Sequence, residues 1–231
     1  MKRIKLIGYL FSPESNDVMS KVYALAYSNI YLNNLDKMIP SNFYSIYDRL
    51  GMISDSVNHY DRFINKLEQV HNLGCNILEV GGGNLPRIAE RIAKRQIDIG
   101  CGSITVMDPS LSVKKSKYKN LKLCKEKFTL ETDIKDYDLL IGLFPCTVME
   151  LMLHKALIEN KDLFFRMCDC VHYSDDLSEE LYNYYLEHPD YYRKMLIESY
   201  VDYSNVFNRN MEVIDDDTPI LSIKNKVRSK K

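Results

Sequence analysis

Three consecutive glycines, Gly81 to Gly83, directly follow a short apolar run, and an amphipathic helical pattern begins almost at once after them. A strand, a tight glycine turn and a helix in this order bring bare backbone amides and a helix N-terminus to the end of a buried strand. Gly81 permits a sharp turn, and Gly83 lets a ligand approach the main chain. This arrangement suits the binding of a nucleotide-like ligand. The alternative is a glycine-rich connection that binds nothing.

Two carboxylates stand where such a ligand would lie. Glu79 is close to the end of the apolar run before the glycines, and Asp108 ends the next predicted strand. A carboxylate at the position of Asp108 can accept hydrogen bonds from both hydroxyl groups of a ribose. The alternative is that Asp108 forms a turn or caps a helix together with Pro109 and Ser110.

Further candidates follow two later predicted strands. Phe144, Pro145 and Cys146 end one strand, and His172 and Tyr173 come just after the next. Both groups fall on the edge of the sheet where ligands bind in open α/β folds. We interpret Phe144 and Pro145 as walls of the pocket, since a nucleophilic Cys146 would need an activating neighbour that the sequence does not show. His172, with Tyr173, is a candidate general base. The alternative is a polar loop before a helix.

The elements that position these residues belong to an α/β fold. From Cys75 onward, apolar runs alternate with helical patterns. Five strand–helix units predict a mostly parallel sheet covered on both faces, and an acidic turn near the C-terminus predicts an antiparallel hairpin that brings the sheet to about seven strands. The predicted strands are 77–80, 103–108, 121–128, 138–146, 162–170 and two within 211–225, and the predicted helices are 85–94, 148–159, 177–187 and 190–206.

The first ~70 residues have a different pattern, with apolar residues at helical spacing and only Gly8 before Gly51. We predict a cap of three or four helices over residues 1–71, which leaves 72–231 for the sheet domain. The cap is expected to cover the ligand edge of the sheet. Its tyrosines indicate packing, with a lid over a flat substrate as the alternative. They are Tyr23, Tyr27, Tyr31, Tyr44, Tyr47 and Tyr60.

Composition narrows the partners and the compartment. A formal net charge of -1 gives no global electrostatic attraction to nucleic acid or to an anionic membrane. No stretch approaches the ~20 apolar residues of a membrane span, and a cytoplasmic location is expected. The cysteines form no CxxC pair, which predicts reduced thiols and no metal site. They are Cys75, Cys101, Cys124, Cys146, Cys168 and Cys170.

The string Glu79-Val80-Gly81-Gly82-Gly83 fits the pattern ExGxG and resembles motif I of the class I S-adenosylmethionine-dependent methyltransferases. In that family the acidic residue lies close to the ligand, and the backbone contacts its methionine and ribose part. Asp108 matches the place of the acidic residue of motif II. The order of elements from about residue 72 to 225 also resembles the Rossmann-like core of this family, in which the C-terminal hairpin supplies an inserted antiparallel strand.

The resemblance implies S-adenosylmethionine as cofactor, held by Glu79, Gly81, Gly82, Gly83 and Asp108. It also implies that residues after the third strand flank the adenine, and Glu126 or Phe128 could do so. The alternative there is a surface charge and a core aromatic residue. The chain departs from the family at Leu85-Pro86, where a further glycine is usual, and at Leu143–Cys146. There it lacks the Asn/Asp-Pro-Pro-aromatic motif of members that methylate amino groups on bases or glutamines.

Two hypotheses of function follow. The first is methyl transfer to a small-molecule acceptor, in which the protein mainly aligns the acceptor with the methyl carbon. The second is a non-catalytic relative that binds or regulates. A nucleic-acid substrate is a weaker third hypothesis because the net charge is close to neutral. A homodimer is left open.

Overall fold

The computed structural model describes residues 54–145, 148–167, 179–214 and 219–224. The chain divides into two compact units, Met1–Arg62 and Phe63–Lys231, and the sheet belongs to the second. Most of the predicted helical cap lies outside the described residues, as do His172 and Tyr173. The boundary near residue 71 and the position of the cap therefore stay predictions.

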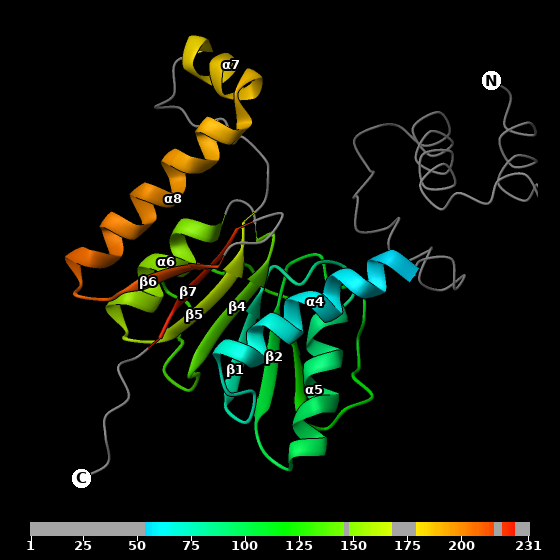
Figure 1. The fold of residues 1–231 in the computed structure, drawn as a ribbon. Coiled ribbons are helices and arrows are strands. Elements are labelled where there is room, and N and C mark those ends of the chain that lie inside the picture. Colours follow the sequence, from blue (N-terminus) through cyan, green and yellow to red (C-terminus); the bar gives the residue numbers. More distant parts are fainter. Residues whose placement is uncertain (1–53, 146–147, 168–178, 215–218, 225–231) are drawn as a thin grey trace, which may run out of the picture. The chain divides into compact units, whose positions relative to one another are not determined.

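The second unit is built on one seven-stranded sheet with the order β3-β2-β1-β4-β5-β7-β6 (Figure 1). The first five strands run parallel, and β7 pairs antiparallel with both β5 and β6. The predicted α/β fold and the inserted antiparallel strand are both confirmed. The strands are β1 (Asn76–Val80), β2 (Ser103–Met107), β3 (Leu121–Cys124), β4 (Leu139–Leu143), β5 (Asp162–Arg166), β6 (Met211–Ile214) and β7 (Ile220–Ile223).

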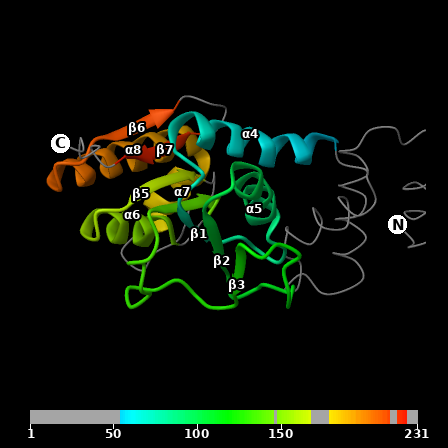
Figure 2. The ribbon, with the colours of Figure 1, turned by 90° about the horizontal axis from the view of Figure 1, so that it is seen from below.

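Helices cover both faces of this sheet (Figure 2). Side chains alternate along β1, so that Leu78 and Val80 pack in the core on the side of α6 and α8, whereas Glu79 points to α5. On β5, Phe164 and Phe165 also point to opposite faces of the sheet. Phe164 packs against α4, and Phe165 packs against α8. The helices are α4 (Ser54–Val70), α5 (Arg87–Ile99), α6 (Met149–Ile158), α7 (Glu179–Glu187) and α8 (Pro189–Val206).

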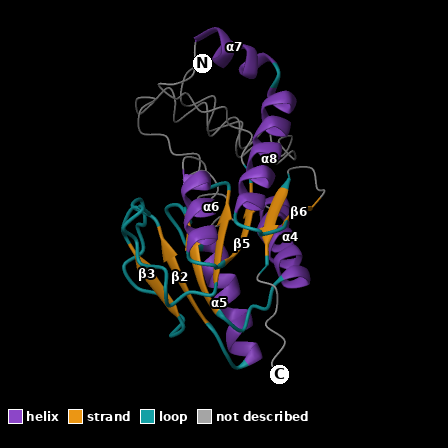
Figure 3. Cartoon of the chain, turned by 90° about the vertical axis from the view of Figure 1, so that its left-hand side faces the viewer, coloured by secondary structure: helices purple, strands orange, loops and turns teal. Residues whose placement is uncertain are grey.

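The helices of the C-terminal half extend beyond the sheet. Figure 3 shows α8 running beside the strands and α7 continuing past their ends. Tyr200 on α8 packs edge-on against Phe165, with ring centroids 6.3 Å apart. No helix in the described part of the chain has both the length and the apolar composition to cross a lipid bilayer.

Several predicted boundaries were wrong. β3 ends at Cys124 and not at Phe128, because its last pair with β2 is Met107 with Cys124, and the chain then turns away from the sheet. The side chain of Phe128 fills the core instead. The strands β4 and β5 likewise end earlier than predicted, at Leu143 and Arg166.

The helix α5 is longer than predicted and stops at Gly100. This glycine has a φ of 84°, in the left-handed region, and its N–H donates to the carbonyl groups of Gln96 and Ile97. A glycine in this conformation commonly ends a helix because it has no Cβ to clash. The predicted end at Lys94 missed this signal.

A buried polar link joins the end of α4 to the sheet. His71 Nε2 lies 3.0 Å from Ser222 Oγ on β7, and His71 Nδ1 lies 3.3 Å from Asp162 Oδ2 on β5. The order Ser–His–Asp resembles a hydrolytic triad, but Ser222 is only 1% exposed. Since a nucleophile needs access to its substrate, we interpret the three residues as a structural link.

Candidate ligand-binding site

The candidate site lies at the carboxyl ends of β1 and β4. These strands are neighbours in the sheet, and the helices that follow them, α5 and α6, cover opposite faces (Figure 2). In an open α/β sheet, a ligand binds in the crevice at such a topological switch point. Gly81 follows β1 at this point, and Phe144 and Pro145 follow β4.

The three glycines each satisfy a separate geometric demand. Gly81 and Gly83 have φ values of 76° and 71°, in the region where side chains are strained, so the predicted need for glycine is confirmed. A Cβ on Gly81 would also come within 3.3 Å of Pro145 Cα. A Cβ on Gly82 would come 2.4 Å from Val106 Cγ2. The turn therefore tolerates no side chain at Gly81 or Gly82 without strain or movement.

Glu79 supports the turn from the inside. Its side chain is buried, and Oε2 accepts a 3.0 Å hydrogen bond from the N–H of Ala89 in the first turn of α5. That amide is one of those a helix cannot satisfy internally, so Glu79 acts as a remote cap. The pKa of Glu79 is raised to about 8, mainly by burial and in part by the nearby Asp108, against the lowering effect of the hydrogen bond from Ala89. The carboxyl joins the end of β1 to the start of α5.

Asp108 follows β2 and binds the same turn. Its Oδ2 accepts a 2.8 Å hydrogen bond from the N–H of Gly83. Its Oδ1 accepts bonds of 2.7 Å and 2.5 Å from the backbone and hydroxyl of Ser110. The turn-former alternative is thus realised in this structure. A carboxylate offers about four acceptor positions, and three of them are taken, so one is left for a ribose hydroxyl. The predicted contact with both hydroxyl groups stays a prediction.

The loops after β1 and β2 are also tied to one another. Both the N–H and the hydroxyl of Ser112 donate to the carbonyl oxygen of Asn84, at 3.0 Å each. The N–H of Gly81 donates to Met107 at 3.0 Å. These bonds hold the glycine turn against the end of β2 in a fixed shape, which favours a preformed site.

At the end of β4, Phe144 has a φ of 54°, which is rare for a residue with a large side chain. Its N–H donates to Arg166 at 3.0 Å, and the Arg166 guanidinium carbon lies 5.5 Å from the centroid of the Phe144 ring. Sequence reasoning missed Arg166. The available signal was a charged residue that ends the otherwise apolar run Leu163–Phe165 of β5.

Glu126 and Phe128, the predicted neighbours of an adenine, have different surroundings. Glu126 is exposed and lines a groove of about 480 Å³ together with Thr105, Met107 and Tyr137. Phe128 is buried in the hydrophobic core, as the packing alternative expects. The structure brings Glu126 alone to an open surface, and its contact with an adenine stays a prediction.

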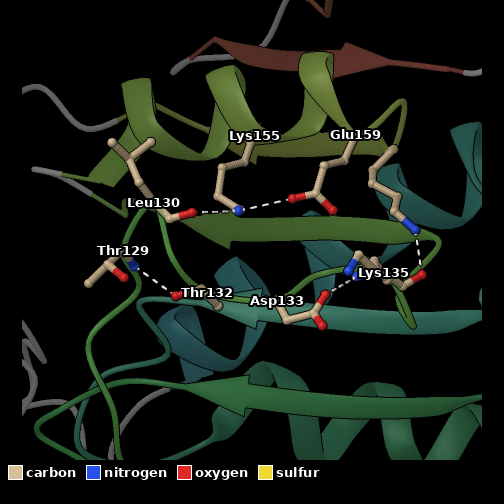
Figure 4. Close-up of polar contacts among 8 residues, drawn as sticks. Thr129, Leu130, Thr132, Asp133, Lys135, Lys155 and Glu159 are labelled. Carbon is tan, nitrogen blue, oxygen red and sulfur yellow. Dashed lines mark hydrogen bonds and ion pairs between the residues drawn. The ribbon is translucent and has the colours of Figure 1, made fainter.

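One wall of this groove is formed by Glu131, Thr132 and Asp133, and the segment that carries them is anchored to α6 (Figure 4). Lys155 Nζ donates to the carbonyl oxygen of Leu130 at 2.8 Å and pairs with Glu159 at 2.9 Å. The N–H of Thr129 donates to Thr132 Oγ1 at 2.8 Å. The segment between β3 and β4 is therefore held in place although it forms no helix.

Within the described ranges, no group of three or more His, Cys, Asp or Glu side chains is arranged to hold a metal ion. Cys75, Cys101 and Cys124 are free thiols. Burial, reinforced by the charges of Asp138 and Asp162, raises the pKa of Cys75 to about 12. A thiol with so high a pKa is a poor nucleophile near neutral pH.

No family model and no curated protein matches the chain. Solved structures do match in fold. A crystal structure of coclaurine N-methyltransferase bound to N-methylheliamine and SAH matches with a TM-score of 0.42 and 14% identity, over 71% of this chain and 56% of that one. The SAH-bound Podospora anserina methyltransferase PaMTH1 matches with a TM-score of 0.40 and 12% identity, over 79% of this chain and 96% of that one.

The fold is Rossmann-like. The antiparallel C-terminal pair is the one that the resemblance to class I methyltransferases implies. The chain spans 56% of the coclaurine N-methyltransferase chain. At sequence identities of 14% and 12%, the similarity to these structures concerns the fold alone. Any statement about activity must rest on the residues of the site.

Proposed function

We propose that this protein binds S-adenosylmethionine and transfers its methyl group to a small-molecule acceptor. The observation that carries the proposal is the turn at the β1–β4 switch point, where Gly81 and Gly83 have positive φ values and the Pro145 backbone closes on Gly81. Such a turn lets a ligand approach the main chain closely at the carboxyl edge of the sheet. The motif resemblance of Glu79 to Gly83 supports S-adenosylmethionine as that ligand.

The residues of the chain would mainly hold S-adenosylmethionine and orient the acceptor. The main chain of the turn would face the methionine part, Asp108 would accept from the ribose, and Glu126 would flank the adenine. Bound S-adenosylmethionine supplies a methyl group that already carries its leaving group, so alignment of the acceptor is the main demand on the protein. His172, with Tyr173 beside it, remains the proposed general base.

A small acceptor, and not a nucleic acid, is favoured by the net charge of -1. A cytoplasmic location belongs to the same proposal. The second candidate function is that of a non-catalytic relative. It is favoured by the internal hydrogen bonds of Asp108, which give this residue a structural role. Its two oxygens already accept three hydrogen bonds from Gly83 and Ser110 within the turn.

Calorimetric titration with S-adenosylmethionine and S-adenosylhomocysteine tests the proposal. We expect both to bind the full chain, and Gly83→Val to abolish binding because φ at Gly83 is 71°. Binding of neither compound to the wild-type protein would favour a non-catalytic relative. If Gly83→Val bound S-adenosylhomocysteine as tightly as the wild type, the turn would not be the site.

A further inference from the structure

The residue that directly follows β4 is strained. Phe144 has a φ of 54° and is followed directly by Pro145. A left-handed conformation is costly for a large L-residue, and a following proline further restricts the preceding residue toward extended geometry. Strain of this kind persists only where the surroundings impose it, and it is concentrated at functional sites. Two of the contacts that restrain Phe144 come from one residue on the next strand.

That residue is Arg166, the last of β5. Its carbonyl oxygen accepts a 3.0 Å hydrogen bond from the N–H of Phe144, and its guanidinium carbon lies 5.5 Å from the centroid of the Phe144 ring. Arg166 is only 5% exposed. A cation over an aromatic face within about 6 Å is attracted to it, and the attraction is stronger away from water. Arg166 thus holds both the backbone and the ring of Phe144.

Pro145 transmits this restraint to the glycine turn. A Cβ on Gly81 would lie 3.3 Å from Pro145 Cα, and a Cβ on Gly142 would lie 2.8 Å from Pro145 Cγ. Pro145 therefore fits between two residues that have room for it only because they lack side chains. Since the orientation of Phe144 fixes where Pro145 begins, a change at Phe144 moves the wall that faces the turn.

We propose that Arg166 is a positioning residue of the ligand site, which sets the Phe144–Pro145 wall against Gly81 by holding Phe144 in its left-handed conformation. The inference rests on the proposed function, since S-adenosylhomocysteine is the probe of the site. It adds a residue of β5, which the glycine turn and its motif do not include.

Two variants and a matched control test the proposal by calorimetry with S-adenosylhomocysteine. Arg166→Met keeps the length of the side chain and removes the cation, and we expect the affinity to fall about 3- to 30-fold. Arg166→Lys keeps a cation that can lie on the ring, and its affinity should be closer to that of the wild type than the affinity of Arg166→Met is. The control is Arg209→Met, because Arg209 binds Asn160 and Lys161 at the amino end of β5, away from the site.

Amide hydrogen exchange supplies a measurement that does not depend on the ligand. The N–H of Phe144 is bonded to Arg166, and the N–H of Val148 is bonded to the carbonyl oxygen of Pro145 at 3.1 Å. Both amides should exchange faster in Arg166→Met and at the wild-type rate in Arg166→Lys and Arg209→Met. Phe144→Leu removes the ring while keeping Arg166, so faster exchange at Val148 is expected there even if Arg166→Met does not fold.

The outcomes separate this inference from the function on which it rests. Faster exchange with weaker binding in Arg166→Met, restored by Arg166→Lys, supports it. Faster exchange with unchanged binding would overturn it, since the wall would then not shape the site. If the wild-type protein does not bind S-adenosylhomocysteine, the proposed function fails. Separately, unchanged exchange at Phe144 and Val148 in both Arg166→Met and Phe144→Leu would overturn the inference that Arg166 restrains Phe144, whatever the binding result.

Discussion

The Oδ2 atom of Asp108 accepts a 2.8 Å hydrogen bond from the N–H of Gly83, although the two residues belong to the ends of different strands. The bond brings the carboxylate predicted to contact a ribose directly onto the turn predicted to approach the ligand. With the two bonds from Ser110, it makes Asp108 part of the framework of the site. Its structural and its ligand-binding roles can be separated by measuring stability and affinity together.

For Asp108→Ala we expect two effects. The free energy of unfolding should fall by about 1–3 kcal/mol, because the partners on Gly83 and Ser110 lose their acceptors. The affinity for S-adenosylhomocysteine should fall about 10- to 150-fold, as expected for charge-assisted hydrogen bonds. Urea unfolding and calorimetry measure the two. Lower stability at unchanged affinity would make Asp108 a turn former only.

The matched pair Gly81→Ala and Gly100→Ala tests the demands on the turn. Both positions have positive φ values, of 76° and 84°, which cost about 1 kcal/mol each for alanine. A Cβ on Gly100 meets nothing within 4 Å, whereas one on Gly81 meets Pro145. We expect Gly81→Ala to be the less stable and to weaken S-adenosylhomocysteine binding by more than ~10-fold. Equal affinities in the two variants would argue against a ligand at the turn.

Glu79 should make stability depend on pH. Its pKa in the folded chain is raised to about 8, mainly by burial. Between about pH 4.5 and 8 the folded chain keeps a proton on Glu79 that the unfolded chain has lost. The wild type should therefore lose stability as pH rises through this window, by up to about 1.4 kcal/mol per pH unit.

Glu79→Gln isolates this effect, because the amide oxygen can still accept from Ala89 and does not titrate. Its free energy of unfolding, relative to that of the wild type, should increase as pH rises from about 5 to 8. Urea unfolding across this range measures the difference, with Glu212→Gln on the exposed surface of β6 as control. A difference that does not change with pH would show that Glu79 titrates in the same way in both states.

The link from α4 to the sheet should contribute to stability and not to binding. His71→Ala removes a buried ring that packs edge-on against Phe164 at 5.7 Å and leaves Ser222 without its bond. We expect a loss of about 2–4 kcal/mol by urea unfolding. Ser222→Ala should cost less, about 0.5–1.5 kcal/mol, because no cavity forms. The affinity for S-adenosylhomocysteine should not change in either variant, and a loss in Ser222→Ala would contradict a purely structural role.

Much of the fold could be predicted from local patterns. Apolar runs and helical periodicity gave the order of strands and helices from β1 to β7, because burial on a strand or on one helix face imposes a period on the sequence. The need for glycine at Gly81 and Gly83 was also predicted from the local sequence, and both residues have positive φ values, which few other residues adopt. The antiparallel pairing of β6 with β7 could be predicted from two apolar runs separated by acidic residues.

What the tertiary structure decided concerns contacts between residues that are distant in the sequence. The pattern around Phe128 fits a strand, but the pairing of β3 with β2 ends at Cys124, so the phenylalanine packs in the core. The contact between Arg166 and Phe144 and the bond between His71 and Ser222 exist only once β4, β5 and β7 lie side by side. A sequence period records that a side chain is buried. Which partner it meets depends on the strand order, and that order is set by packing over the whole sheet.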